Sequence, residues 1–345
     1  MKIGNFDLQN DGVFVIAELS ANHNGNLQNA LDTIKAAHEI GANAIKLQTY
    51  TADTLTLNCD KEDFIVKGGT LWDGKSYYEL YKEAYTPWEW HKELFEYARS
   101  LGIDIFSTPF DKSAVDFLEQ FNPSAYKIAS FEITDYELVR YTASKKKPII
   151  ISTGIALKEE IEDVVRICKE VGNENIILLK CTSAYPAPLE LANLKTIPDM
   201  KETFKVEVGF SDHTLGITAP ILAVGLGACV IEKHFILKRS IGGPDAEFSL
   251  EKEEFASMIK AIREAQKLLG TPTYNTEVKD IKGRAFCRSL YVSQDIKKGE
   301  VISEENIRSV RPGHGLHPKY LKDILGKKAK RDYSFGERFK LEDIE

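Results

Sequence analysis

The sequence has few cysteines and lacks any apolar run long enough to cross a bilayer. Its five cysteines are odd in number and scattered without CxxC spacing, which argues against a disulfide framework or a cysteine metal site. The first residues have no apolar core of the kind found in signal peptides. The most apolar stretch, 217–231, is too short for a transmembrane helix. We therefore expect a protein of the reducing cytoplasm that has no membrane partner.

The sequence also lacks an excess of basic residues. It has 45 Lys and Arg against 52 Asp and Glu, so its net charge is −7. General nucleic-acid binding needs a broad basic surface, and we expect no nucleic-acid partner. A local basic pocket for a small anion is still compatible with this charge. The shares of apolar (43%) and charged (28%) residues are those of an ordinary globular enzyme.

What the sequence does have is a recurring pair of elements, a short apolar strand and then an amphipathic helix. The predicted strands are 13–17, 42–47, 103–106, 125–128, 148–151, 176–179, 206–208 and 228–231. Examples of the predicted helices are 27–39, 87–101, 158–171 and 251–269. Eight such repeats predict an α/β fold, a (β/α)8 TIM barrel. The alternative is an open doubly wound sheet, which would want a Gly-rich turn after the first strand, where only residues 22–25 (NHNG) stand.

The chain divides into three parts. Residues 1–270 form the predicted barrel, and 271–283 are polar and resemble a linker. Residues 284–345 form a second unit of short strands and turns, which is too small to be very stable alone. Within the barrel, residues 49–85 form a long segment with little periodicity on the expected catalytic face, and long loops of this kind are usually functional.

Two lysines are predicted to point into the barrel near its catalytic end. Strand alternation turns Lys46 inward while its neighbours in the sequence face the helices, and the same reasoning applies to Lys127. A buried ammonium group is costly unless it is paired. The two lysines therefore suggest a bound anion, and an internal ion pair with Glu18 or Glu132 is the alternative.

Hydroxyl groups accompany these lysines at the ends of four strands. Small donors beside lysines suit a phosphate or carboxylate ligand. Each hydroxyl taken alone is more typical of a helix cap, so the hypothesis depends on the set. The hydroxyl residues are Thr108, Ser130, Ser152 and Ser211.

The last two predicted strands each lead into a histidine, His213 and His234. Neighbouring strands lie about 4.8 Å apart, so two imidazoles at matching strand ends can meet at one divalent cation. A single histidine would more often be structural. Carboxylates that could orient ligands or move protons are those of Glu18, Glu132, Glu232 and Asp245.

Along nearly its whole length the chain resembles the sialic acid synthase (NeuB-like) family. The matching segments are AELSANHNG (17–25), IKLQT (45–49), YKIAS (126–130), STG (152–154), CTSAYP (181–186), GFSDHT (209–214), EKHF (232–235) and GPD (243–245). The C-terminal part resembles the antifreeze-like (SAF) domain with which these synthases end. Within the family, SANH (20–23), GGTLWDG (68–74) and TPWEWH (86–91) resemble the branch that makes pseudaminic acid.

The resemblance implies a transferase that joins phosphoenolpyruvate to an N-acetylated amino-sugar aldehyde. It implies that phosphoenolpyruvate is held by Lys46, Thr108, Lys127, Ser130, Ser152, Ser183 and Ser211. It implies a divalent cation, Mn²⁺ or Mg²⁺, on His213 and His234, and sugar contacts from Gln48, Tyr185 and Asp245. The acidic positions near the metal and the aldehyde would be Glu18, Glu132 and Glu232.

The resemblance also implies a partner subunit and an acceptor. Arg311 matches an arginine that reaches the active site of the partner in a domain-swapped homodimer. The branch implies a 2,4-diacetamido-2,4,6-trideoxyhexose acceptor, for which Trp72, Tyr77 and Tyr78 could supply apolar walls. N-acetylneuraminate or legionaminate synthesis is the alternative within the family. A Schiff-base aldolase that uses Lys180 is a distant one, and a barrel that only binds sugar is a third.

Overall fold

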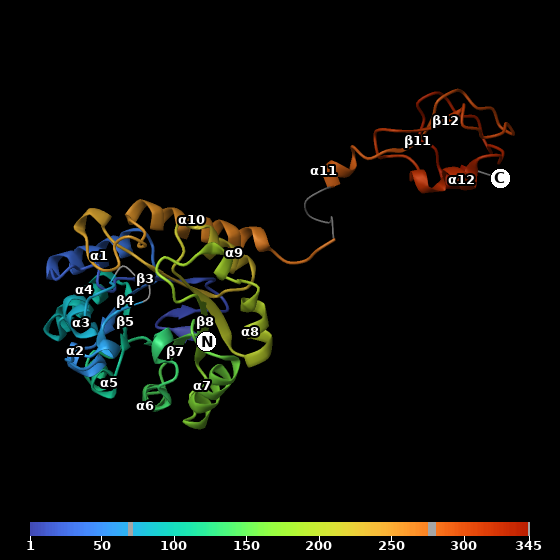
Figure 1. The fold of residues 1–345 in the computed structure, drawn as a ribbon. Coiled ribbons are helices and arrows are strands. Elements are labelled where there is room, and N and C mark those ends of the chain that lie inside the picture. The colour runs from blue at the N-terminus through green and yellow to red at the C-terminus, as the bar shows by residue number, and fades with distance from the viewer. Residues whose placement is uncertain (68–71, 275–280, 344–345) are drawn as a thin grey trace. The chain divides into compact units, whose positions relative to one another are not determined.

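The computed structural model describes residues 1–67, 72–274 and 281–343. The chain forms two compact units, Met1–Gly270 and Thr271–Glu345, which are described separately. In Figure 1 the first unit runs from blue to orange, and a ring of helices surrounds its strands. Within the described residues, no helix has both the length and the apolar character needed to cross a membrane.

Eight parallel strands close into a barrel in the first unit, in the order β10-β3-β4-β5-β6-β7-β8-β9. The strands are β3 (Phe14–Glu18), β4 (Ala44–Thr49), β5 (Asp104–Pro109), β6 (Tyr126–Ile128), β7 (Ile149–Ser152), β8 (Ile176–Cys181), β9 (Glu207–Asp212) and β10 (Val230–His234). The predicted barrel is confirmed, and the open sheet is excluded because β10 pairs with β3. Most strands end later than predicted, since polar residues such as Ser211 continue the backbone ladder where apolar patterning stops.

Eight helices surround the strands. They are α1 (Leu27–Glu39), α4 (His91–Leu101), α5 (Lys112–Glu119), α6 (Tyr136–Ser144), α7 (Lys158–Glu170), α8 (Thr196–Phe204), α9 (Thr218–Gly225) and α10 (Lys252–Leu269). Asn26 starts α1, because its side chain accepts hydrogen bonds from the amides of Gln28 and Asn29. Short 3₁₀ turns occur at η2 (Trp88–Trp90), η3 (Ser130–Glu132), η4 (Leu189–Leu191) and η5 (Arg239–Ile241). The predicted helix 87–101 therefore begins as a 3₁₀ turn.

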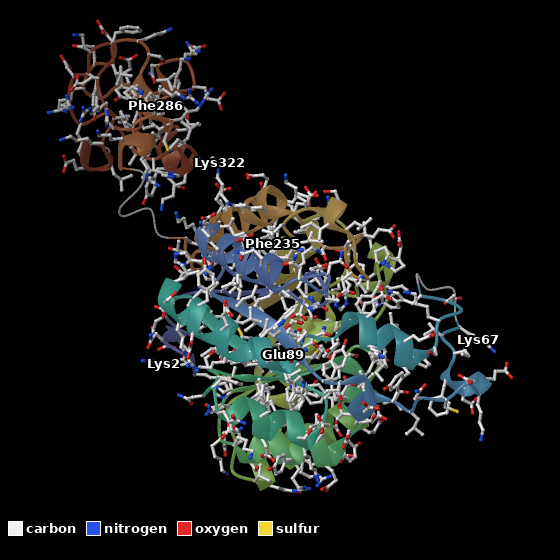
Figure 2. The ribbon with its side chains drawn as sticks, turned by 90° about the vertical axis from the view of Figure 1, so that its left-hand side faces the viewer. Lys2, Lys67, Glu89, Phe235, Phe286 and Lys322 are labelled. Carbon is white, nitrogen blue, oxygen red and sulfur yellow. The ribbon has the colours of Figure 1, made fainter. Side chains whose placement is uncertain are left out.

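The barrel has two apolar layers, as strand alternation requires. Ile45 and Leu47 pack in the outer layer between strands and helices. Ala44 lies in the inner layer, with Phe14 and Phe106. Phe235, labelled in Figure 2, directly follows β10 and meets Phe255 of α10 edge-on, with ring centroids 5.0 Å apart. This contact anchors the end of β10 against the helical layer.

Two features of the first unit are absent from the predicted fold. A hairpin of β1 (Lys2–Ile3) and β2 (Phe6–Asp7) precedes the barrel, and Ile3 joins the inner apolar cluster. The segment 49–85, expected to lack periodicity, contains α2 (Ala52–Leu55), η1 (Glu62–Phe64) and α3 (Tyr77–Ala84). A capping box between Ser76 and Glu79 begins α3. Residues 68–71, part of the segment that resembles the pseudaminic branch, lie outside the described residues.

The second unit has an apolar core of its own. Its described elements are α11 (Ile281–Arg284), β11 (Ser289–Val292), β12 (Ile307–Val310), η6 (Pro318–Tyr320), α12 (Leu321–Ile324) and η7 (Leu341–Asp343). β11 and β12 pair antiparallel, and Leu290, Ile307 and Phe339 lie in the core. Residues 275–280 of the predicted linker lie outside the described residues.

Candidate active site

Four charged side chains from four strands meet at the carboxyl end of the barrel. The Lys46 ammonium lies 3.2 Å from Glu18 and 3.0 Å from Glu232. The Lys127 ammonium lies 3.8 Å from Glu232 and donates to the Ser152 hydroxyl at 2.6 Å. All four charged residues are buried. Lys46 thus forms an internal ion pair with Glu18, which the sequence analysis gave as the alternative to a bound anion. It has Glu232 as a second partner.

The pKa values in this cluster favour an excess of positive charge. Burial raises the pKa of Glu18 to about 8, although Lys46 opposes the rise. Burial alone would raise the pKa of Glu232 as well, but Lys127 and Lys46 lower it to about 2. Burial lowers the pKa of Lys127 only to about 8. Both buried lysines thus face Glu232, whose carboxyl they hold in its charged form, and this concentration of buried cationic groups suits an added anion.

Hydroxyl groups lie at the same end of the barrel. The Ser183 hydroxyl donates to Ser130 at 2.9 Å, and the Ser211 hydroxyl donates to Glu232 at 3.0 Å. Ser130 accepts from the amide of Ile155, 25 residues away, so it does not act as a local helix cap. Within the described residues, the buried Thr108 hydroxyl has no hydrogen-bond partner. An unsatisfied buried donor of this kind suits an incoming anion.

Gly154 leaves room for these hydroxyls. A Cβ atom at this position would lie 2.3 Å from the Ser183 hydroxyl oxygen and 2.8 Å from that of Ser130. Any larger residue would push both hydroxyls out of place. Glycine is needed here because the side chains of Ser183 and Ser130 approach the backbone closely.

His213 and His234 lie close together at the ends of β9 and β10. Their ring centroids are 5.5 Å apart. The Nδ1 of His213 donates to the Thr182 carbonyl at 3.0 Å, which leaves Nε2 as an acceptor. The Nδ1 of His234 is buried, has no hydrogen-bond partner among the residues that the structure describes, and lies 3.7 Å from Asp245. An unsatisfied buried nitrogen and an imidazole oriented by a carbonyl fit the requirements of a cation site.

Both imidazoles are held in the neutral form that binds metals. Burial lowers the pKa of His213 to about 4 and that of His234 to about 3. The described residues contain no cluster of three or more His, Cys, Asp or Glu side chains placed to hold an ion. The residues thus fit a cation held by two histidines, with its other positions open to water or substrate.

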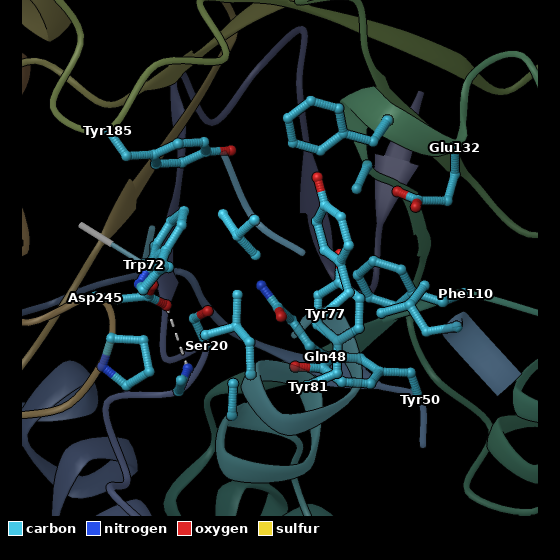
Figure 3. Close-up of a pocket in the computed structure, with 18 of the residues that line it drawn as sticks. Ser20, Gln48, Tyr50, Trp72, Tyr77, Tyr81, Phe110, Glu132, Tyr185 and Asp245 are labelled. Atoms are coloured by element: carbon cyan, nitrogen blue, oxygen red, sulfur yellow. Dashed lines mark hydrogen bonds between the residues drawn. The ribbon is translucent and has the colours of Figure 1, made fainter. Parts of the chain in front are cut away.

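A cavity of about 510 Å³ opens beside the histidines (Figure 3). Figure 3 shows Trp72 and Tyr185 on one side of the cavity and Tyr50, Tyr77, Tyr81 and Phe110 on the other. The wall role predicted for Tyr78 is wrong. Its hydroxyl donates to Asp53 at 3.1 Å, and it does not line the cavity. Because the segment folds as a helix, Tyr77 and Tyr81 share the face that lines the cavity, and Tyr78 points elsewhere.

The predicted sugar-contacting residues and Glu132 also line this cavity. Gln48 donates to Glu18 at 3.0 Å, and Tyr185 packs on His213 with ring centroids 4.4 Å apart. Asp245 accepts from the amide of Ala21 at 3.4 Å. One Glu132 oxygen is buried and has no hydrogen-bond partner in the described part of the chain, and burial raises the pKa of this carboxyl to about 7.

Lys180 is turned away from the cavity. Lys180 lies between two residues of β8 that face the interior, and its ammonium donates to the Cys181 carbonyl at 2.6 Å. This orientation argues against the Schiff-base reaction, which needs a lysine that reaches the substrate. Arg311 is exposed on the second unit, whose position relative to the barrel is not defined.

Sequence reasoning missed several side chains of the site. The aromatic residues Tyr50, Tyr81 and Phe110 were not anticipated, although the four-residue spacing of Tyr77 and Tyr81 after a capping box could have indicated a helix. The ion pair between Asp212 and Lys233 was also missed. An alternation pattern does not reveal it, because both side chains face the outer layer.

The carboxyl end of this barrel holds a cluster of lysines suited to an anion, two neutral histidines and an aromatic cavity. These features are typical of barrel enzymes that act on small anionic substrates. The NeuB family matches residues 33–274, and the SAF domain matches residues 288–345. This chain belongs to the NeuB family, as the resemblance predicted.

Known relatives agree with this assignment over the whole chain. The sequence is 56% identical over 344 residues to the pseudaminic acid synthase of Campylobacter jejuni, covering 100% of both chains. It is 40% identical to the N,N'-diacetyllegionaminic acid synthase of Legionella pneumophila, covering 96% of this chain and 94% of the relative. The crystal structure of SpsE, a spore coat polysaccharide biosynthesis protein from Bacillus subtilis, has a TM-score of 0.67 at 34% identity, covering 100% of this chain and 99% of that one.

Proposed function

We propose that this chain is a pseudaminic acid synthase. It condenses phosphoenolpyruvate with 2,4-diacetamido-2,4,6-trideoxy-L-altrose and water to give pseudaminic acid and phosphate. The observation that carries the proposal is the adjacency of the cationic cluster at Lys46 and Lys127 to an aromatic cavity at the histidines. The identity of 56% to a pseudaminic acid synthase, against 40% to a legionaminic acid synthase, supports this acceptor.

The side chains of the cluster hold phosphoenolpyruvate. Lys46 and Lys127 balance the phosphate and carboxylate charges, and the free Thr108 hydroxyl donates to them. Ser130, Ser152, Ser183 and Ser211 supply the remaining donors. Holding the enol carbon against the aldehyde is catalysis by positioning, which can lower a barrier by about 7–11 kcal/mol at best.

A divalent cation on His213 and His234, Mn²⁺ or Mg²⁺, supplies Lewis-acid polarisation of the aldehyde when bound. The enol carbon of phosphoenolpyruvate attacks the aldehyde carbon, water adds at C2, and phosphate leaves. The aldehyde oxygen gains a proton in this sequence. Glu132 is placed to give it, because its carboxyl is buried in the cavity and its pKa is raised to about 7. Glu18 and Glu232 hold Lys46 in position.

The aromatic walls suit a 6-deoxy acceptor. Tyr77 and Tyr81 stack with ring centroids 6.0 Å apart, and Tyr50 meets Phe110 edge-on at 5.0 Å. A methyl group packs on such rings, whereas the 6-hydroxyl group of another sugar would lose its hydrogen bonds to solvent water there. Gln48 and Asp245 supply polar contacts on the same cavity.

A phosphate-release assay tests the assignment. Phosphoenolpyruvate is offered with N-acetylmannosamine and with the L-altrose and D-mannose forms of the diacetamido-trideoxy sugar, each with Mn²⁺, Mg²⁺ or chelator. We expect phosphate release with the L-altrose form, lost on chelation. Preference for the D-mannose form would make the chain a legionaminate synthase, and preference for N-acetylmannosamine a neuraminate synthase. No release with any sugar would favour a binding protein.

A domain-swapped homodimer is the assembly we propose, with Arg311 of each chain reaching the acceptor in its partner. Charge supports such docking: residues 1–270 have 29 Lys and Arg against 40 Asp and Glu, and residues 271–345 have 16 against 12. An acidic barrel and a basic second unit attract each other.

Complementation between two variants tests the swap. Arg311→Ala and His213→Ala are each expected to lose activity, the former about 10- to 100-fold through loss of a charged hydrogen bond. Co-expressed with different tags and purified as the mixed dimer, they are expected to regain activity, because one intact barrel receives one intact arginine. If Arg311 acted on its own barrel, the mixed dimer would remain as inactive as Arg311→Ala.

A further inference from the structure

A fully buried ion pair lies directly behind the two histidines. The Lys233 ammonium is 2.5 Å from a carboxylate oxygen of Asp212, and both side chains are 0% exposed. The ammonium also donates to the Thr214 carbonyl at 2.5 Å. The other Asp212 oxygen accepts from the amide of Thr214 at 2.9 Å. Each charged group thus makes two hydrogen bonds at the ends of two adjacent strands.

The pair is the last cross-strand connection before the histidines. The backbone register of β9 and β10 pairs Glu232 with Ser211 and then Lys233 with Asp212, where it ends. His213 and His234 are the next residues on each strand. On the inner side of the strands Ser211 donates to Glu232, and on the outer side Lys233 binds Asp212. The two strands are therefore joined on the inner face two residues before the imidazoles and on the outer face one residue before them.

The surroundings of the ion pair bear on whether it serves stability or the positioning of the strands. The outer apolar layer includes residues of α9 and α10 such as Ala223, Phe255 and Met258, and Glu254 of α10 acts electrostatically on Lys233. A well-packed apolar pair at such a place is often as stable as a buried ion pair, so stability does not require these charges. A buried pair with fixed hydrogen-bond geometry does specify one relative position of the strands, which apolar packing specifies less well.

We propose that the Asp212–Lys233 pair is a positioning pair, which sets the separation of His213 and His234 and thereby the affinity of the site for a divalent cation. This inference rests on the proposed metal role of the two histidines. The loop that follows is held by the same pair, because Thr214 bonds to both members. Loss of groups that orient metal ligands typically weakens metal binding about 10- to 100-fold.

The double variant Asp212→Asn with Lys233→Met tests the pair. It removes both charges together, leaves no charge unpaired, and keeps similar volumes. Mn²⁺ binding is measured directly by electron paramagnetic resonance, alongside thermal unfolding. We expect the dissociation constant for Mn²⁺ to rise about 10- to 100-fold while the protein stays folded. The matched control is Glu39→Gln with Lys252→Met, which removes a surface ion pair between α1 and α10. It is expected to bind Mn²⁺ as the wild type does.

The outcomes are separable. A folded double variant whose Mn²⁺ affinity stays within twofold of wild type overturns the positioning role. If that variant does not fold, Lys233→Arg retains the charge but displaces the head group, and unchanged Mn²⁺ affinity in it overturns the proposal equally. If the wild type binds Mn²⁺ no better than His213→Ala does, the proposed metal role itself fails.

Discussion

Replacement of His213 by alanine is expected to reduce kcat/KM by about 10³-fold or more. Polarisation of the aldehyde by a cation contributes several kcal/mol to the transition state, and each 1.36 kcal/mol corresponds to about tenfold in rate. With one of two imidazole ligands removed, the site no longer holds the cation in place. His234→Ala is expected to act likewise, because its Nδ1 is the unpartnered nitrogen of the site.

The measurement is steady-state phosphate release over a range of Mn²⁺ concentrations, with thermal unfolding as a check on the fold. His38→Ala is the matched control, since His38 is exposed near the end of α1 and lies away from the cavity. It is expected to retain wild-type activity. Metal-dependent activity of His213→Ala within tenfold of wild type would contradict the assignment of this histidine as a ligand.

Replacement of Glu132 by glutamine is expected to lower kcat by about 10²- to 10⁴-fold, the usual contribution of a general acid. Burial raises the pKa of Glu132 to about 7, so the carboxyl is protonated below this pH and ionised above it. If the protonated form is the active one, wild-type kcat/KM falls as the pH rises through about 7. The amide cannot ionise, so the variant is expected to lose this part of the pH profile.

The pH profile of kcat/KM for wild type and variant checks this role. Glu119→Gln is a suitable control, because Glu119 accepts a hydrogen bond from Tyr126 at the end of α5 and does not line the cavity. A variant that keeps the alkaline decline of the wild type would assign the titration to another group. A kcat for Glu132→Gln close to wild type would remove Glu132 as the proton donor.

Local patterning was enough to predict the barrel and the direction of its lysines. Alternation in β4 placed Ile45 and Leu47 in the outer layer and Lys46 inward, as the structure has them. It did not predict that Glu232 would be the shared partner of Lys46 and Lys127. That contact follows from closure of the barrel, which brings β10 beside β3, and a closed ring cannot be deduced from any single strand.

The acceptor cavity was predicted less well, because its walls come from the segment between β4 and η2. Without a recognised helix, Tyr77 and Tyr78 were treated as equivalent. The helix α3 separates them, and Tyr81 takes the place expected for Tyr78. The proximity of the two histidines was easier to predict, since residues at the matching ends of adjacent strands lie close together.

Closure of the barrel by β3 and β10 has a consequence for synthesis of the protein. β3 leaves the ribosome early, but its partner Val230–His234 is made more than two hundred residues later. Until then one edge of β3 is unpaired, and an exposed edge strand invites pairing with other chains. Glu18 and His234 stand opposite each other in this last seam. The proposed active site is therefore complete only when nearly the whole barrel has been translated, and we expect chains interrupted before Val230 to be inactive and prone to aggregate.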